Sequence, residues 1–105
     1  MPKIALIVLK PRKDKTKQLI TLLKESMVTL QRLGIASGRE QIIAESKDGF
    51  LIHIFEWATE DSQDVASEHS EVRDLWMRAA KLSDFQKPNT IKEFDELFPT
   101  LNMIS

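Results

Sequence analysis

FLIHIFEWATEDSQDVASEHSEVRDLW, residues 50–76, decides the fold, because an apolar strand is followed there by an amphipathic helix. The preceding Asp48-Gly49 pair favours a tight hairpin turn with positive φ angles, so residues 50–57 are expected to pair with residues 40–46. Thr59 or Ser62 can cap the helix that follows. At spacings of four and three, one face of this helix is predicted to carry Val65, His69, Val72, Trp76 and Ala79. An imidazole is therefore expected within an apolar stripe.

The rest of the chain predicts two more strands and two more helices. Residues 4–9 are apolar at every position, as in a strand that is covered on both faces. Asp14 is a reasonable N-cap for a long helix with leucines at helical spacing, which Gly34 stops. A fourth strand is expected at residues 85–87, and a capping box at residues 90–93 predicts a short helix.

The resulting order is strand, helix, strand, strand, helix, strand. This βαββαβ order is that of ferredoxin-like α+β domains with an antiparallel sheet. Two helices cover only one face of such a sheet, yet strand 50–57 is apolar on both faces. Because monomers rarely expose large apolar patches, the second face is expected to pair with a second copy of the chain.

Composition indicates one domain over residues 1–105, with its core in residues 3–88 and a short helix and tail in residues 89–105. A net charge of -1 argues against a nucleic-acid partner. The chain has no cysteine, which excludes thiolate nucleophiles and cysteine-based metal sites within it. The apolar run at residues 4–9 is too short to span a membrane and lacks a signal-peptide cleavage pattern, so a cytoplasmic location is expected.

A group of short motifs carries a resemblance to a known family. The motifs are Phe55-Glu56-Trp57, the turn at residues 59–62, Glu68-His69, Val72, Leu75-Trp76 and Asp84-Phe85. With them, residues 4–88 resemble the dimeric α/β barrel proteins of the antibiotic-biosynthesis-monooxygenase (ABM) type. The resemblance implies that two sheets pair into a barrel in a homodimer, with a pocket between sheet and helices in each subunit. The superfamily includes oxygenases, haem-degrading enzymes, isomerases and members without known activity.

His69 is the candidate catalytic residue. A neutral imidazole can accept a proton from a phenol or an activated carbon acid, and it can also ligate a metal or haem iron. The alternative is a core histidine that is hydrogen-bonded to the backbone.

The candidate substrate-binding residues share the apolar character of the predicted pocket and are Trp57, Trp76, Val72, Val65 and His53. The two tryptophans could stack on a flat aromatic molecule or fill the core. His53 could line the barrel or the dimer interface. Alternation along the strand does not settle which of its faces meets the helices.

The leading hypothesis is a cofactor-independent monooxygenase that acts on a small hydrophobic aromatic metabolite, phenolic or polycyclic, with His69 as the proton acceptor. No metal or cofactor is expected, because the chain has no phosphate-binding loop and no metal-ligand spacing. The alternative is a homodimer of the same fold that binds a small ligand without catalysis or is purely structural. Haem degradation is disfavoured, since haem-degrading members have an asparagine on the first strand and residues 4–10 contain none.

Overall fold

The computed structural model describes residues 2–105 as an α+β fold with one antiparallel sheet. Strands β1 to β5 span Ile4–Pro11, Ile42–Glu45, Leu51–Glu56, Ser83–Gln86 and Asn102–Met103, in the sheet order β4-β1-β3-β2-β5. Helices α1, α2 and α3 span Thr16–Arg32, Ser62–Glu68 and Ser70–Leu82. Two 3-10 turns follow at Pro88–Thr90 and Lys92–Asp95. The predicted order of strands and helices is confirmed, except that the second helix is split in two and a fifth strand is added.

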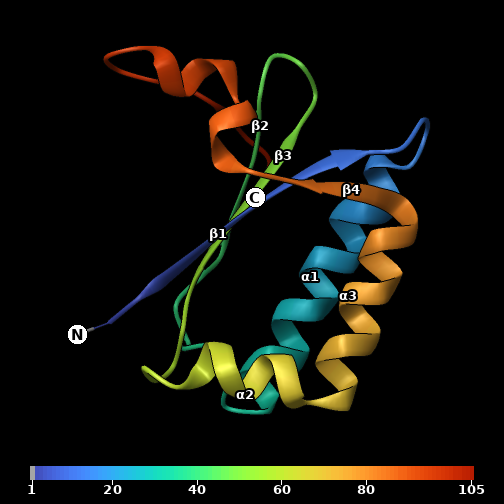
Figure 1. The fold of residues 1–105 in the computed structure, drawn as a ribbon, viewed down its shortest axis with the longest axis vertical. Helices are drawn as coiled ribbons and strands as arrows, with labels where there is room; N and C mark the ends of the chain where they lie inside the picture. The colour runs from blue at the N-terminus through green and yellow to red at the C-terminus, as the bar shows by residue number, and fades with distance from the viewer. Residues whose placement is uncertain (1) are drawn as a thin grey trace.

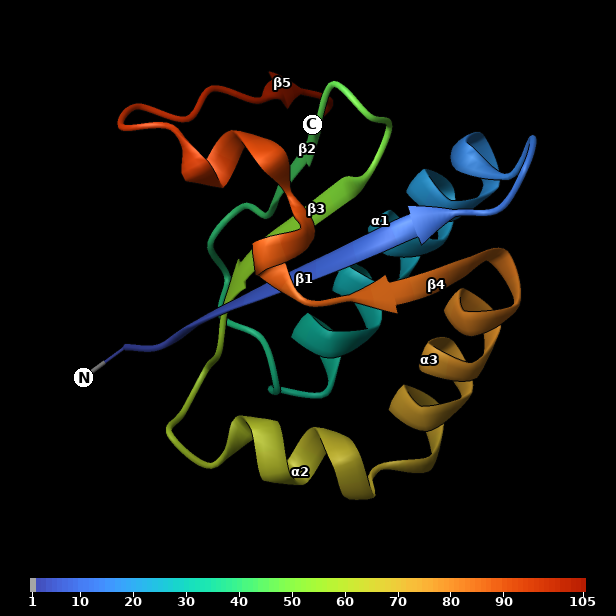
Figure 2. The same ribbon diagram turned by 45° about the horizontal axis from the view of Figure 1, so that its top comes forward.

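The sheet separates the helices from the C-terminal segment. Helices α1 and α3 lie side by side against one face, and α2 lies across one end of it (Figure 1). The C-terminal segment lies on the opposite side of the sheet, as the turned view shows (Figure 2), and packs against that face through Ile91, Phe94 and Leu101. We call the face toward α1 and α3 the inner face and the other the outer face.

The hairpin between β2 and β3 forms as predicted, but with one positive φ rather than two. Gly49 has φ +84°, whereas Asp48 is not among the residues with positive φ. The backbone N–H of Ser46 donates to the carbonyl of Phe50 at 2.9 Å, and the Ser46 hydroxyl accepts from the N–H of Phe50. A single left-handed glycine therefore suffices to reverse the chain.

Helix α1 ends where the sequence predicts and begins without the predicted cap. Gly34 has φ +73°, its N–H donates to the carbonyl of Gln31, and the N–H of Ile35 donates to that of Leu30. These two bonds form a Schellman motif. Asp14 does not cap the helix, because it adopts φ +62° in the preceding turn and Lys15 stands at the N-cap without a side-chain bond.

The predicted helix with Val65 and His69 on one face is wrong, because the chain breaks there. Helix α2 ends at Glu68, and His69 adopts extended backbone angles of φ -85° and ψ 125° before α3 begins at Ser70. The break turns the two halves in different directions. Val65 is consequently 47% exposed, whereas Val72 is fully buried.

The inner face of the sheet supplies most of the core. The odd-numbered residues of β1 and β3 point toward α1 and α3, so Leu51, His53 and Phe55 share the inner face. They pack with Leu19, Leu23, Met27 and Leu30 of α1 and with Val72, Leu75 and Ala79 of α3. The structure thus settles that His53 faces the helices.

The C-terminal segment covers part of the outer face. Ile91, Phe94 and Leu101 pack against Val8, Ala44 and Ile52, and β5 extends the sheet beside β2. The predicted short helix is replaced by the 3-10 turns, and the Glu93 carboxylate accepts from the Lys47 N–H at 2.8 Å instead of closing a capping box. The expectation of a wholly uncovered second face is therefore corrected.

An apolar part of the outer face remains open. Ile4, Leu6 and Ile42 are 67%, 37% and 39% exposed, and all three lie on outer-face positions of β1 and β2, the two strands that flank β3. Within residues 2–105, no helix has the length and apolarity needed to cross a bilayer.

Candidate functional site

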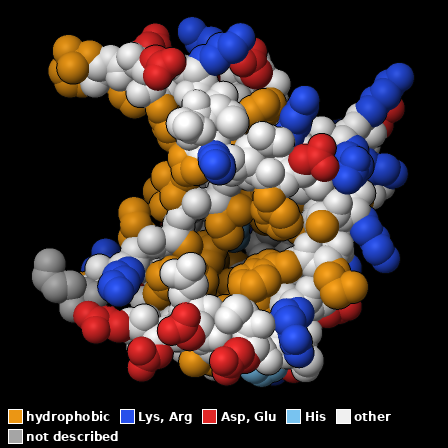
Figure 3. Space-filling model, in the orientation of Figure 1, with side chains coloured by type: hydrophobic (Ala, Val, Ile, Leu, Met, Phe, Trp, Pro, Cys, Tyr) orange, Lys and Arg blue, Asp and Glu red, His pale blue; other side chains and the backbone are white. Residues whose placement is uncertain are grey.

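A small cavity lies between the inner face of the sheet and the helices. Its volume is about 30 Å³, and every strand or helix around it contributes apolar side chains. The residues that matter most for its chemistry and its opening are Ile7, Ser26, His53, Trp76, Ala79 and Phe85. Figure 3 shows hydrophobic side chains around a hollow in this region, where Figure 1 places the sheet and helices. The cavity lies between sheet and helices, where the resemblance implied a pocket.

His53 supplies a polar group at the floor of the cavity. It lies on β3, the middle strand, opposite Ile7 of β1 and Ile43 of β2. Its side chain is 2% exposed, and its Nε2 lies 2.6 Å from Oε1 of Gln41. Because a carbonyl oxygen only accepts, this contact makes Nε2 the protonated ring nitrogen.

Burial keeps the His53 imidazole neutral. Desolvation lowers the pKa of His53 from its usual 6.5 to about 4, since a charged ring would lose its hydration among apolar neighbours. At neutral pH the ring therefore carries one proton, which it donates to Gln41.

The other ring nitrogen, Nδ1, has no hydrogen-bond partner among residues 2–105. Among the described residues, Gln41 is the one hydrogen-bond partner of the ring, and it contacts Nε2. No fully buried side-chain nitrogen or oxygen in residues 2–105 lacks a partner, so Nδ1 must border accessible space. His53 is one of the residues that line the cavity, and an unprotonated ring nitrogen is a hydrogen-bond acceptor.

Two aromatic side chains form movable parts of the wall. Phe85 is 48% exposed and lies on β4, an edge strand that pairs with β1 through Leu9. Trp76 is half-buried on α3. Because neither is locked in the core, a rotation of either side chain would enlarge the cavity without moving the sheet.

His69 does not line this cavity. It stands at the junction of α2 and α3, half-buried, where its Nδ1 accepts from the backbone N–H of Glu71 at 3.3 Å. The expected bond between histidine and backbone is thus present, although the side chain caps a helix and lies outside the core. Its expected catalytic role stays a prediction.

The other predicted binding residues are dispersed. Trp76 lines the cavity with His53, whereas Val72 packs in the neighbouring core and Val65 faces solvent. Trp57 packs edge-on against Phe55 with ring centroids 4.9 Å apart, and the Phe55 ring in turn lies 5.1 Å from His53. The structure therefore brings two of the predicted side chains together at the cavity, and places Trp57 at the end of an aromatic row.

Ser26 and Phe85 are among the cavity residues that sequence reasoning did not identify. Ser26 lies three and four residues from Leu23, Leu22 and Leu30, so helical spacing already places it on the apolar face of α1. Phe85 was assigned to a strand, but its face could not be chosen without the register that pairs it with Leu9.

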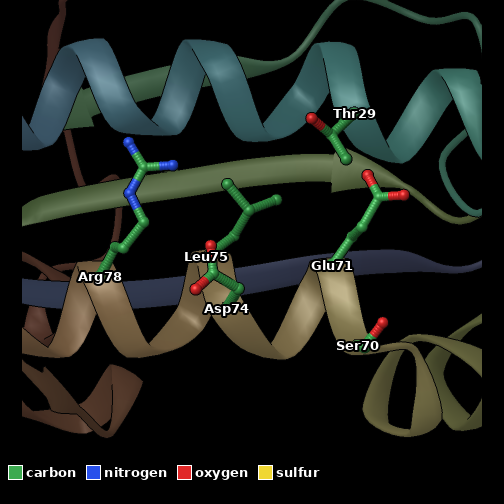
Figure 4. Close-up of a pocket in the computed structure, with 6 residues that line it drawn as sticks. All are labelled: Thr29, Ser70, Glu71, Asp74, Leu75 and Arg78. Carbon is green, nitrogen blue, oxygen red and sulfur yellow. The ribbon is translucent and has the colours of Figure 1, made fainter.

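A larger hollow on the outer surface of the helices is lined by charged side chains. Figure 4 shows Glu71 and Arg78 reaching from α3 toward α1, with Leu75 between them and Thr29 opposite. This open groove has a volume of about 370 Å³. Arg78 pairs with Glu25 at 3.3 Å, and Glu71 pairs with Arg32. The groove is therefore a solvated, ion-paired helix surface, and the cavity around His53 is the better candidate site.

Metal binding finds no support in the geometry. Within the part of the chain that the structure describes, no three side chains of histidine, aspartate or glutamate lie in an arrangement that could hold an ion.

Comparisons with protein-family models, with curated proteins and with solved structures found no match.

Proposed function

We propose that this protein binds a small hydrophobic molecule between the inner face of its sheet and helices α1 and α3, with His53 as the polar anchor. The observation that supports this proposal is the apolar cavity lined by His53, whose ring has Gln41 as its hydrogen-bond partner within residues 2–105 and contacts it through Nε2. Binding sites of this kind are mostly apolar and hold a few polar groups that orient the ligand.

The volume of the cavity limits the size of the ligand that it can hold. A volume of about 30 Å³ suits water-sized occupants, whereas sites for drug-sized molecules measure roughly 300–1,000 Å³. A ring-sized ligand therefore has to displace a wall residue. Phe85 and Trp76 are the side chains whose partial exposure allows this. We expect ligands of one or two rings rather than extended molecules.

Cofactor-independent oxygenation of such a ligand is the second candidate function. It is supported by the resemblance to the ABM type and by a neutral imidazole in an apolar site. In this proposal His53, rather than His69, accepts the proton of a phenolic substrate, because His53 lines the cavity. A pKa of about 4 makes His53 a weak base, and for this reason binding is the primary proposal.

We further propose that the chain forms a homodimer in which the outer faces of two ferredoxin-like sheets meet, as in dimeric α/β barrels. The exposed side chains of Ile4, Leu6 and Ile42 support this assembly, since they are apolar and lie on the same face of the sheet, on the two strands that flank β3. The ligand site lies on the inner face and is built from one chain.

A cavity-filling substitution tests the binding proposal. Ala79 lines the cavity and is 5% exposed, whereas the neighbouring Ala80 is exposed on the same helix. We expect Ala79→Val to weaken the binding of small aromatic compounds, measured by NMR titration, and Ala80→Val to leave it unchanged. The pair is matched in helix propensity. Equal binding by both variants would place the ligand elsewhere.

Oxygen consumption tests the second candidate separately. An oxygen electrode would record uptake with phenolic or anthrone-type compounds that bind the wild-type protein. Uptake that requires the protein and falls in Ala79→Val would support oxygenation in the cavity. Binding without uptake would leave a ligand-binding protein.

A further inference from the structure

We propose that the cavity selects ligands whose buried end carries a hydrogen-bond donor, such as an alcohol or phenol hydroxyl, and rejects isosteres that lack one. This inference rests on the proposed binding function and names the chemical class of its ligand. It follows from the two polar groups that α1 and β3 place in the cavity wall, Ser26 and His53.

His53 presents an acceptor because its donor is already engaged. The short contact of 2.6 Å between Nε2 and Oε1 of Gln41 fixes the proton on Nε2. Nδ1 consequently offers a lone pair. Burial opposes protonation of that nitrogen, so it does not become a donor at neutral pH.

Ser26 presents an acceptor for the same reason. Its hydroxyl donates to the carbonyl of Leu23 at 2.8 Å, within α1. A hydroxyl has one proton and two lone pairs, so Oγ has only acceptor capacity left for a ligand. Both polar groups thus require a donor from whatever occupies the cavity.

One side-chain donor also belongs to the cavity wall, the indole N–H of Trp76. Trp76 is half-buried, whereas His53 is 2% exposed, so of these two residues Trp76 is the more accessible to solvent. The remaining wall residues are apolar. The deepest polar atom that a ligand meets is therefore an acceptor, and a ligand carbonyl or ether oxygen placed there would face a lone pair.

Phenol and toluene provide a direct test, because they are nearly equal in size and differ in the donor. An entirely apolar cavity would favour toluene, since the hydroxyl of phenol loses its hydration on burial. We expect the wild-type protein to bind phenol about tenfold more tightly than toluene, because toluene leaves Nδ1 unsatisfied. Anisole, which has an acceptor in place of the donor, should bind no better than toluene. Affinities would come from NMR titrations.

Three variants identify the residues responsible. His53→Leu should reverse the order, so that toluene binds more tightly than phenol, and Ser26→Ala should reduce the preference for phenol. Trp76→Phe keeps an aromatic wall without the N–H and should preserve the preference. The ¹⁵N chemical shifts of the wild-type ring provide a check that needs no variant: they should show protonated Nε2 and unprotonated Nδ1, with Nδ1 shifting when phenol binds.

The outcomes separate this inference from the function on which it rests. Equal binding of phenol and toluene, or tighter binding of toluene by the wild-type protein, would overturn the donor preference and leave ligand binding intact. Protonation of the His53 ring on Nδ1 would likewise overturn the donor preference and leave ligand binding intact. If phenol, toluene and anisole all failed to bind, the proposed function would be overturned, and the donor preference with it.

Discussion

His53 ties the stability of the fold to pH, because its imidazole is buried in the neutral form. Its pKa is lowered to about 4 in the folded chain, while an unfolded chain has the ordinary value near 6.5. Between these two values the unfolded chain binds more protons, so stability rises with pH across this window. The contribution is fully present above about pH 6.5 and is lost as the pH falls toward 4. The difference corresponds to about 3 kcal/mol.

Urea unfolding at pH 4.5 and pH 7 would measure this dependence. We expect the wild-type protein to lose stability at the lower pH, and His53→Leu to lose much less, since no histidine then remains at this position. Carboxylates also titrate in this range, so the difference between the two proteins is the relevant quantity. Identical pH profiles would show that His53 is not held neutral by the fold.

His69 is expected to contribute to stability through its position at the start of α3. Its Nδ1 accepts from the Glu71 N–H at 3.3 Å, which satisfies a donor that the helix itself leaves free. We expect His69→Ala to lower the free energy of unfolding by about 0.5–1 kcal/mol and His69→Asn to retain most of it, because asparagine caps helices well. Chemical denaturation would measure both.

The same variants also test the catalytic role that the sequence suggested for His69. We expect both His69→Ala and His69→Asn to bind ligands as the wild-type protein does. Loss of ligand binding or turnover in both, with unchanged stability, would restore His69 as the functional histidine.

At the scale of elements, helices and strands with strong local sequence signals were predicted from the sequence. Features that depend on tertiary contacts were not. The helical spacing of apolar residues in α1 and the end of the helix at Gly34 could be predicted from the sequence, because helix termination by a left-handed glycine depends only on neighbouring residues. The break at His69 was not readable, since Val65, Val72 and Trp76 keep helical spacing across it and no glycine or proline marks it. Glu93 was misassigned because its partner, Lys47, lies in a distant hairpin.

Gly34 and Gly38 form a matched pair for testing the end of α1. A Cβ at either position would meet no atom within 4 Å, so packing is equal for both. Gly34 has φ +73°, whereas Gly38 is not among the left-handed residues. We expect Gly34→Ala to destabilise the protein by about 1 kcal/mol, and Gly38→Ala to be neutral or slightly stabilising. Equal urea midpoints for the two variants would contradict this account.

The candidate site was predictable only in part, for a reason that involves the whole sheet. His53 and Trp76 were among the candidate substrate-binding residues that the sequence suggested. The sequence could not show that His53 faces the helices, because β3 is apolar on both faces. In the structure the C-terminal segment places Ile91 and Phe94 over the other face. Knowing it, one would have expected His53 rather than His69 to lie at the floor of the cavity.

For the whole molecule, the proposed dimer interface and the cavity lie on opposite faces of the sheet, so the cavity is expected to function within one chain. The proposed dimer uses the outer face, on which Leu6 is 37% exposed, while Val28 on α1 is 67% exposed away from that face. We expect native mass spectrometry to show a dimer for the wild-type protein and for Val28→Glu, and a monomer for Leu6→Glu, because a buried unpaired charge opposes association. A monomeric wild-type protein, or dimers in both variants, would refute this interface.

Since β1, β3, α1 and α3 of one chain surround the cavity, monomeric Leu6→Glu should still prefer phenol to toluene. Loss of binding in that variant would mean that the partner chain holds the cavity in its binding form.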